Sequence, residues 1–440
     1  MVECVTRTDP DRRFGRLTKV SEPGGQEAVR VTTAFNQLLQ LDGANVRDVS
    51  VEQTMVVVTV ALQRRRLHCP ECGYTTRARY DARPVDSRWR HLDLGRWQLE
   101  IRARLRRLRC PTHGVRTEGV PFARPRTGFT RDFEDLVAWL ATKMDKSAIE
   151  RLSRIAWRTV GRIIERVVAD ELDPNRLDNL FEVGVDEISW RRHHRYLTLV
   201  VDHRSDDVVW GAEGRDAATL DSFFAELGED RATQLRAVSM DLGGAYAKSV
   251  GANAPHATIC LDPFHLVALV GRALDHVRRH AWQQLRHLPD PAVARRFKGA
   301  RWALLKAPHN LTADQARTLK AIKRNGGEAW RAYRLKEAFR EIFAADLTVD
   351  EARQLLQRWC AWAQRSRLEP FVKVARTIRT HLQGILNTIR LGLSNGRLEG
   401  LNNRVRLICR RAFGFHSADA ALALVMLSCG PIHLRLPHER

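Results

Sequence analysis

The sequence between residues 182 and 213 contains three apolar stretches, EVGVDEIS (182–189), YLTLVVD (196–202) and VVWGAE (208–213). Each is rich in β-branched residues and has the length of a buried strand, and the segments between them suit hairpin turns. A helix is expected next, over residues 217–227, and then a short apolar strand, AVSM (237–240). Three antiparallel strands, a helix and a further strand predict an α/β core built on one sheet.

Two acidic residues lie on these strands, where a carboxylate is costly. Asp186 is inside an apolar strand and Asp241 ends another, and an unpaired buried carboxylate costs several kcal/mol. The strand order is that of an RNase H-like core, in which the first and fourth strands are neighbours, so Asp186 and Asp241 are expected to converge. Converging acids repel each other unless divalent cations hold them together. Glu187 should face the other side of its strand and is interpreted either as structural or as a residue that supports the ligands without being one. Asp202 and Asp262 also end apolar strands and remain candidates.

Two short Cys/His motifs precede this core, CPEC (69–72) and CPTH (110–113), each followed by glycine. A pair of ligands two residues apart in a tight turn can aim both side chains at one tetrahedral Zn²⁺. We therefore predict a zinc ribbon whose ligands are Cys69, Cys72, Cys110 and His113. The stretch WQLEIRARL (97–105) alternates as a strand does and is expected to join the two knuckles. His68 and His91 are alternative fourth ligands.

Helical periodicity begins after Pro125. Phe133, Leu136, Val137 and Leu140 share one face of a first helix, and two short helices over 147–152 and 156–164 follow with a tight connection. This pattern is typical of a helix-turn-helix whose second helix presents Arg158, Thr159 and Arg162 to a DNA groove. An ordinary helical hairpin with a solvated basic face gives the same pattern.

The charge balance favours a polyanionic partner. The 440 residues include 73 Lys and Arg against 51 Asp and Glu, which gives a formal net charge of +22. Such an excess points to nucleic acid, although a ribosomal or membrane-surface protein would carry the same sign. We find no uncharged apolar run long enough to span a bilayer and no secretory signal, so we expect a cytoplasmic protein without a membrane partner.

Residues 266–391 are helical almost throughout in their pattern and contain many aromatic residues. The simplest interpretation is that these aromatics form the core of a helical subdomain, although some could stack on unpaired bases.

Four motifs then occur in order along the chain: GVDE (184–187), MDLGGAY (240–246), LDPFH (261–265) and SNGRLEGLN (394–402). Together with the tail RVRLICRRAFG (404–414), the Cys/His pairs and the helix-turn-helix, they make residues 35–430 resemble the ISL-three family of bacterial insertion-sequence transposases. The resemblance implies a DDE transposase in which Asp186, Asp241 and Glu399 are the catalytic acids and bind Mg²⁺ or Mn²⁺. It also implies that Asp262 and His265 lie beside the metal ions and orient DNA, whereas His265 could equally be a core histidine paired with Asp262.

The resemblance implies the following organisation: a loose arm (1–30), a β-rich region with the zinc ribbon (31–125), a helix-turn-helix (126–172), the first part of the RNase H-like core (173–266), a helical insertion (267–392) and the closing helix and tail of the core (393–440). The family often has four cysteines in its ribbon, and His113 takes the last place here; histidine is an acceptable tetrahedral ligand for a structural Zn²⁺.

The implied activity is Mg²⁺-dependent cleavage at terminal inverted repeats, followed by strand transfer into target DNA. Two DNA ends must be brought together, so a homodimer or larger assembly on double-stranded DNA, at the bacterial nucleoid, is expected. The rival hypotheses are an RNase H-like nuclease without joining activity and a catalytically dead DNA-binding regulator. A regulator has no need of Asp186, Asp241 and Glu399 together.

Overall fold

The structure is a computed structural model that describes residues 29–191, 195–287, 289–393, 396–412 and 414–439, without the side chains of Arg296 and residues 396–399. The expected arm therefore lies almost wholly outside the described residues. The chain divides into two compact units at Glu171/Leu172, and the residues from His433 onward group with the N-terminal unit. No helix in the described part of the chain is long and apolar enough to cross a membrane.

The first unit begins with a four-stranded sheet in the order β1-β2-β7-β6. Its strands are β1 (Ala44–Val51), β2 (Met55–Leu62), β6 (Ser87–Leu94) and β7 (Trp97–Ala103), and helix α1 (Val31–Leu39) packs on β1. Alternating side chains such as Val56, Val58, Leu99 and Ile101 are buried in one core. The strand predicted from residue 97 is therefore confirmed, and it lies between the two knuckles along the chain. Its apolar residues pack with those of β2, and β7 pairs with β2 and β6.

The two Cys/His motifs lie in smaller sheets. The first follows β3 (Leu67–His68), which pairs with β4 (Thr75–Thr76), and the second connects β8 (Arg106–Cys110) to β9 (Gly114–Thr117), with β5 (Asp81–Ala82) on the other edge of β8. Leu67 and Leu108, each fully buried, pack together with Cys69 and Cys110. This small apolar core holds the two knuckles side by side.

Three helices end the first unit: α2 (Arg131–Lys143), α3 (Lys146–Ser153) and α4 (Trp157–Glu171). Thr130 and Asp145 accept hydrogen bonds from the first turns of α2 and α3, as helix-capping residues do. Arg154 has a φ of 55°, and this left-handed residue ends α3 so that the chain turns tightly into α4. The predicted helix-turn-helix is confirmed.

The second unit contains a five-stranded sheet in the order β12-β11-β10-β13-β14. Its strands are β10 (Glu182–Arg191), β11 (Arg195–Asp202), β12 (Val208–Glu213), β13 (Ala237–Met240) and β14 (Thr258–Leu261). The first three are antiparallel, whereas β13 is parallel to both β10 and β14. The predicted RNase H-like strand order, with the first and fourth strands adjacent, is confirmed.

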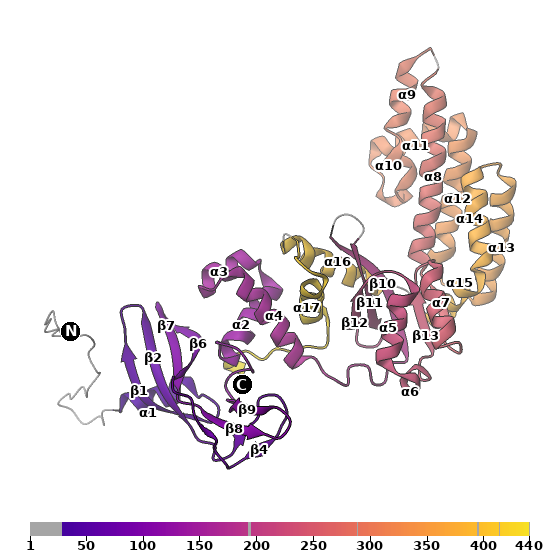
Figure 1. Cartoon of the computed structure of the whole chain (residues 1–440). Helices are drawn as coiled ribbons and strands as arrows, with labels where there is room; N and C mark the ends of the chain where they lie inside the picture. The colour runs from indigo at the N-terminus through magenta and orange to yellow at the C-terminus, as the bar shows by residue number, and fades with distance from the viewer. Residues whose placement is uncertain (1–28, 192–194, 288, 394–395, 413, 440) are drawn as a thin grey trace. The chain divides into compact units, whose positions relative to one another are not determined.

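Helices cover this sheet (Figure 1). They are α5 (Ala217–Leu227), α6 (Glu229–Ala232), α7 (Gly244–Asn253), α16 (Gly396–Arg411) and α17 (Ala418–Cys429). Helix α16 packs on β10 and α17 on β12. The approach of α17 is close, because a Cβ at Gly211 would lie 2.6 Å from the Leu422 side chain.

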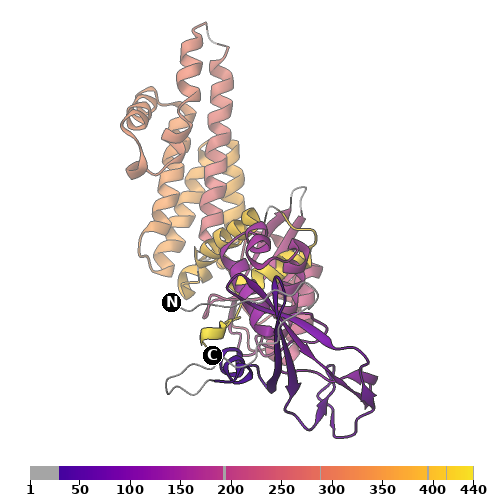
Figure 2. The ribbon, with the colours of Figure 1, turned by 90° about the vertical axis from the view of Figure 1, so that its left-hand side faces the viewer.

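Between β14 and α16 the chain forms a helical insertion (Figures 1 and 2). Its helices are α8 (Pro263–Leu285), α9 (Pro291–Lys298), α10 (Arg301–Leu305), η1 (Pro308–Asn310), α11 (Ala313–Asn325), α12 (Gly327–Ala344), α13 (Val349–Arg365), α14 (Glu369–Thr380) and α15 (Leu382–Leu391). Phe339, Trp359 and Phe371 are buried in its core, as the simplest interpretation of the aromatics predicts, whereas Trp302 is 51% exposed.

Helix α15 fastens the insertion to the edge of the sheet. Asn387 donates a hydrogen bond to the Ile259 carbonyl at 2.9 Å, and Thr388 donates one to the Leu261 carbonyl at 2.9 Å. Gly384 makes the approach possible, because a Cβ there would lie 2.8 Å from Leu261. Carbonyl groups at the edge strand β14 are satisfied in this way.

Candidate active site and zinc-ribbon cluster

The register of the sheet brings Asp186 and Asp241 close together on neighbouring strands. β10 pairs with β13 only from Glu182 to Gly184, so Asp186 lies two residues beyond the last pair, within a strand that continues to Arg191. β13 ends at Met240, and Asp241 follows directly. Both carboxylates therefore lie where the pairing of β10 with β13 ends. Asp202 lies elsewhere, because its strand is antiparallel and pairs it with Val183, near the first residue of β10.

Helix α8 brings two further groups to this end of the sheet. His265 Nε2 lies 2.9 Å from Asp241 Oδ1 and 3.8 Å from Asp262 Oδ2. Asp262 is also the N-cap of α8 and accepts a hydrogen bond from the Phe264 amide at 3.2 Å, with Pro263 in the first helical position. We call Asp186, Asp241, Asp262 and His265 the acidic site. His265 thus pairs with Asp241 as well as with Asp262, so neither of the two interpretations from the sequence describes it alone.

Asp186 is only 7% exposed, and both of its oxygens accept hydrogen bonds. The Glu187 amide donates to Oδ1 at 2.7 Å, and the Asn402 side chain donates to Oδ2. Burial raises the pKa of Asp186, the Asn402 hydrogen bond lowers it, and the nearby Asp241 raises it further, with a net increase. The sequence interpretation missed Asn402. Its signal was its place in SNGRLEGLN, three residues after Glu399 on the same helix.

Glu187 lies close to the acidic site without being one of its four groups. Its side chain is half-buried, and burial raises its pKa; Arg215 opposes this increase, whereas Asp241 and Asp186 add to it. Glu187 therefore lies within electrostatic range of the acidic site. Tyr246, on the first turns of α7, shares a 2.8 Å hydrogen bond with Thr198 on β11 and has its pKa raised to about 12, chiefly by burial.

One predicted catalytic residue remains to be placed. Glu399 belongs to α16, but its side chain lies outside the described residues.

The acidic site has the donor set of a divalent-cation site. In the described residues, no Lys or Arg lies within 4 Å of the carboxylates of Asp186, Asp241 or Asp262, and His265 is their one basic neighbour. Burial raises the pKa of Asp262 as it does that of Asp186. The Asp241 carboxylate raises the pKa of His265. Oxygen ligands gathered without a protein cation suit Mg²⁺ or Mn²⁺.

The four predicted zinc ligands come together in the first unit, and we call them the zinc-ribbon cluster. Their ligand atoms all lie within 4.8 Å of one another. His113 Nδ1 is 3.8 Å from Cys69 Sγ and 3.6 Å from Cys110 Sγ, and Cys72 Sγ is 3.5 Å from Cys110 Sγ. Tetrahedral Zn²⁺ with bonds of about 2.0–2.3 Å separates its ligand atoms by roughly 3.5–3.8 Å. The residues therefore fit this metal.

The surroundings of the cluster favour the thiolate form of Cys110. Burial acts to raise the pKa of Cys110, but hydrogen bonds from the backbone and ring of His113 outweigh it and lower that pKa to about 6. His68 is not among the clustered groups. His91 is buried and shares a 2.8 Å hydrogen bond with Thr130, and burial lowers its pKa to about 4. Neither alternative histidine is placed as a ligand.

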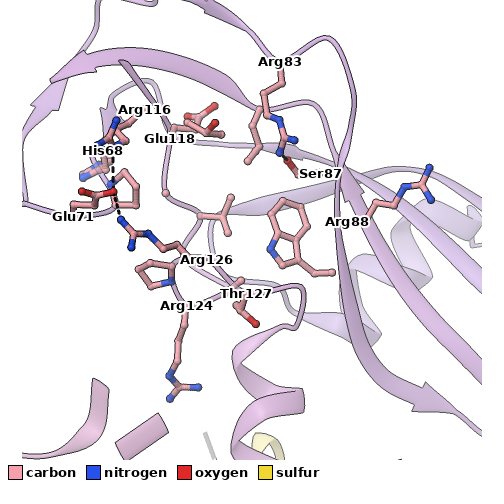
Figure 3. A pocket seen from close by; sticks show the side chains of 18 of the residues that line it. His68, Glu71, Arg83, Ser87, Arg88, Arg116, Glu118, Arg124, Arg126 and Thr127 are labelled. Carbon is pink, nitrogen blue, oxygen red and sulfur yellow. Dashed lines mark hydrogen bonds and ion pairs between the residues drawn. The ribbon is translucent and has the colours of Figure 1, made fainter. Parts of the chain in front are cut away.

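Glu71 connects the cluster to the chain that leads into α2. Its carboxylate lies 3.8 Å from His113 Nε2 and accepts hydrogen bonds from Arg116 at 3.1 Å and Arg126 at 2.6 Å. Figure 3 shows Glu71, Arg116 and Arg126 on the wall of a pocket of about 590 Å³. Several of its arginines are engaged, since Arg83 donates to Ser87 and the buried Arg124 pairs with acids of α2 and α4. We interpret this pocket as a structural junction.

The proposed DNA-reading residues lie on the first turns of α4. Arg158 and Arg162 are exposed and Thr159 is half-buried, whereas Val160 and Ile163 on the other side are fully buried. Trp157, which the sequence interpretation did not single out, is 48% exposed beside them. The first turns of the second helix are where helix-turn-helix proteins contact base edges.

Comparison with known proteins agrees with this architecture. A family profile described as a transposase matches residues 183–424. A profile for the helix-turn-helix domain of transposase family ISL3 (ISL-three above) matches 118–168, and one for the zinc-finger of transposase IS204/IS1001/IS1096/IS1165 matches 65–113.

Two related proteins extend over most of the chain. The transposase for insertion sequence element IS1557 of Mycobacterium tuberculosis is 43% identical over 389 residues, which cover 84% of this chain and 87% of the relative. The transposase for insertion sequence element IS1001 of Bordetella parapertussis is 29% identical over 356 residues, 80% of this chain and 86% of the relative. The chain therefore belongs to the ISL3 family of DDE insertion-sequence transposases.

Proposed function

We propose that Asp186, Asp241 and Glu399 are the catalytic, metal-binding acids of this transposase. The observation that carries the proposal is that the buried Asp186 and the half-buried Asp241 lie together where the pairing of β10 with β13 ends, with no Lys or Arg of the described residues within 4 Å of either carboxylate. Support for Glu399 comes from Asn402, which donates to Asp186 from the same helix. Residues three positions apart share one side of a helix, and this spacing supports the assignment of Glu399 to the same site.

We infer that the cations are Mg²⁺ or Mn²⁺. Bound at this site, such ions activate the attacking oxygen and stabilise the leaving oxygen in phosphoryl transfer. The protein's own part is to fix the carboxylates: the Glu187 amide and Asn402 orient Asp186, and the end of β13 orients Asp241. Asp262 and His265 are proposed to lie beside the ions and to orient the DNA phosphate. His265, with its raised pKa, can offer a proton to a phosphate oxygen.

We propose further that the N-terminal modules recognise terminal inverted repeats, with Zn²⁺ held by the zinc-ribbon cluster and with Arg158, Thr159 and Arg162 in a DNA groove. Phosphate contacts supply affinity, and base contacts supply specificity. The working modules are those expected from the sequence, with boundaries near residues 125, 172, 266 and 392. Because two ends must be cut and joined together, a homodimer or larger assembly on chromosomal DNA in the bacterial cytoplasm is proposed.

The test uses purified full-length protein, Mg²⁺ and DNA that carries the inverted repeats flanking the gene. We expect cleaved and joined products with the wild type, and neither with Asp186→Asn, Asp241→Asn or Glu399→Gln. Asp202→Asn is the matched control, because that residue pairs with Val183 near the first residue of β10 and is not part of the acidic site. Products that persist in the three variants would refute the assignment, and cleavage without joining in the wild type would favour a nuclease.

A further inference from the structure

The open side of α8 carries a line of polar and basic side chains that begins at Arg272, seven positions after His265 of the acidic site. The outward positions at helical spacing are Arg272, His276, Arg279, Gln283 and Arg286, all exposed, which we call the α8 stripe. On the other side of the helix, Leu266, Val270, Leu274 and Val277 are buried. The stripe therefore runs from two turns beyond the acidic site to the remote end of the insertion along one helix.

At that remote end, α9 and α10 add cations held against tryptophan rings. Arg286 lies 5.0 Å and Lys298 5.6 Å from the ring of Trp282, and Arg301 lies 5.0 Å from the half-exposed ring of Trp302. We call Trp282, Arg286, Lys298, Arg301 and Trp302 the distal surface. Cation–π contacts orient these side chains without cancelling their charge. Figures 1 and 2 show α9 and α10 beside the part of α8 that lies away from the sheet.

Little nearby acid neutralises these cations. Between residues 276 and 306 the sequence has eight Lys and Arg and a single acid, Asp290. Asp275, on α8, pairs with Arg278 at 2.7 Å and Arg279 at 3.0 Å. Within the described part of the chain, Arg272, Arg286, Lys298 and Arg301 have no carboxylate within 4 Å. Arg279 is thus paired, whereas these four cations are not, and such a local excess of positive charge fits a polyanion.

Helix α8 also sets the distance from the acidic site. Trp282 follows His265 by seventeen positions, because 282 minus 265 is 17. At about 1.5 Å per residue the helix rises roughly 25 Å over this interval. With about 3.4 Å per base pair, this is the length of roughly seven base pairs of duplex DNA.

We propose that the α8 stripe and the distal surface hold the backbone of the DNA duplex whose scissile phosphate occupies the acidic site, out to about seven base pairs from that phosphate. The position of the phosphate rests on the proposed function. DNA fits better than a protein partner because the surface has no apolar centre: its exposed ring, Trp302, is paired with a cation. The insertion then acts as a second DNA-binding element, separate from the helix-turn-helix.

The test measures binding of full-length protein to inverted-repeat DNA at increasing salt, without divalent metal. The variant Arg286→Gln/Lys298→Gln/Arg301→Gln should reduce the slope of log affinity against log salt by about two to three, since each lost phosphate contact removes about 0.9. The control Arg365→Gln/Lys373→Gln/Arg376→Gln removes three exposed charges from α13 and α14 and should leave the slope unchanged. An unchanged slope in the first variant overturns the proposal, and this is also the result expected if an acidic protein is the partner.

DNA length tests the distance. Shortening the duplex on one side of the cleavage site to about three base pairs should abolish the difference between wild type and the distal variant, and lengthening it beyond about seven should restore it. Shortening each side in turn shows whether the helical insertion holds DNA of the insertion-sequence element or the DNA that flanks it. A difference that persists with short arms on both sides overturns the proposal. Binding by the Asp186→Asn protein distinguishes a failure of this proposal from a failure of the proposed function. This variant should keep the wild-type salt slope, whatever its cleavage assay shows about the catalytic assignment.

Discussion

The zinc-ribbon cluster and the acidic site differ in how the chain assembles them. The four predicted zinc ligands come from two short turns, 69–72 and 110–113, and their ligand atoms all lie within 4.8 Å of one another. The acidic site draws Asp186 from β10, Asp241 from the end of β13 and Asp262 from the start of α8. Local turns build the first site, whereas the strand order of a whole sheet builds the second.

The two sites also have opposite relations to stability. Metal binding to a structural zinc site contributes directly to folding, because the unfolded chain has no preformed site. Buried carboxylates with raised pKa values, such as Asp186 and Asp262, cost the fold free energy. We therefore expect substitutions in the zinc-ribbon cluster to act on structure first, and substitutions in the acidic site to act on chemistry first.

The largest effect is expected from Cys110→Ser. Losing one thiolate ligand should release the bound zinc. The binding free energy of such structural sites, on the order of 10 kcal/mol, then no longer stabilises the fold. Metal analysis should find about one zinc per wild-type chain and almost none in the variant, and hydrogen exchange should speed up around Leu67 and Leu108. Cys409→Ser, at a half-buried cysteine outside the cluster, should keep the metal. A Cys110→Ser protein with full zinc content would contradict the comparison.

Asp186→Asn should separate chemistry from stability. Loss of a metal-binding carboxylate costs several kcal/mol of transition-state stabilisation, or roughly a thousandfold in cleavage rate. The unfolding midpoint should stay the same or rise, because asparagine keeps the shape and removes the buried charge. Single-turnover cleavage and urea unfolding of the same preparation measure both effects. A marked fall in stability with little change in rate would mean that Asp186 is structural.

The same comparison explains what the sequence could predict. The zinc ligands were found by spacing alone, since each pair lies within one turn. Asp186 and Asp241 followed from the strand order, because the first and fourth strands of this fold are neighbours. The preference for them over Asp202 and Asp262 came from the ordered family motifs.

What the sequence did not show depends on tertiary contacts. Asn402 reaches Asp186 across 216 positions of sequence, and its place in the SNGRLEGLN motif was the one signal that pointed to it. The electrostatic contact of Glu187 with Asp241 joins two strands and depends on the folded sheet. The strand from Trp97 was correct as a strand, but its pairing with β2 could not be predicted, because alternation reports burial and not which sheet a strand joins.

The buried His91, outside both sites, should make the stability of the first unit depend on pH. Its pKa falls from 6.5 to about 4 on burial, so the folded protein resists protonation more than the unfolded chain does. The contribution of His91 to the free energy of unfolding is therefore fully present above pH 6.5. It decreases by about 3 kcal/mol as the pH falls toward 4. His91→Gln should flatten part of this decrease in urea unfolding between pH 7 and 4 and leave the zinc content unchanged. Loss of zinc in His91→Gln would instead identify His91 as a ligand.

The smallest effect is expected from Asn402→Ala, and it tests whether the acidic site is preformed. Without the amide, one oxygen of the buried Asp186 loses its donor and its pKa rises further, because the Asn402 hydrogen bond lowers it. The carboxylate then binds the cation less well, and we expect cleavage to fall roughly tenfold, equivalent to about 1.4 kcal/mol. Raising the Mg²⁺ concentration should recover much of this loss, which it cannot do for Asp186→Asn. Asn403→Ala, at the exposed neighbouring position, is the control. If Asn402→Ala needs no more Mg²⁺ than the wild type, Asp186 is held by the strand alone, and the acidic site is then as locally determined as the zinc-ribbon cluster.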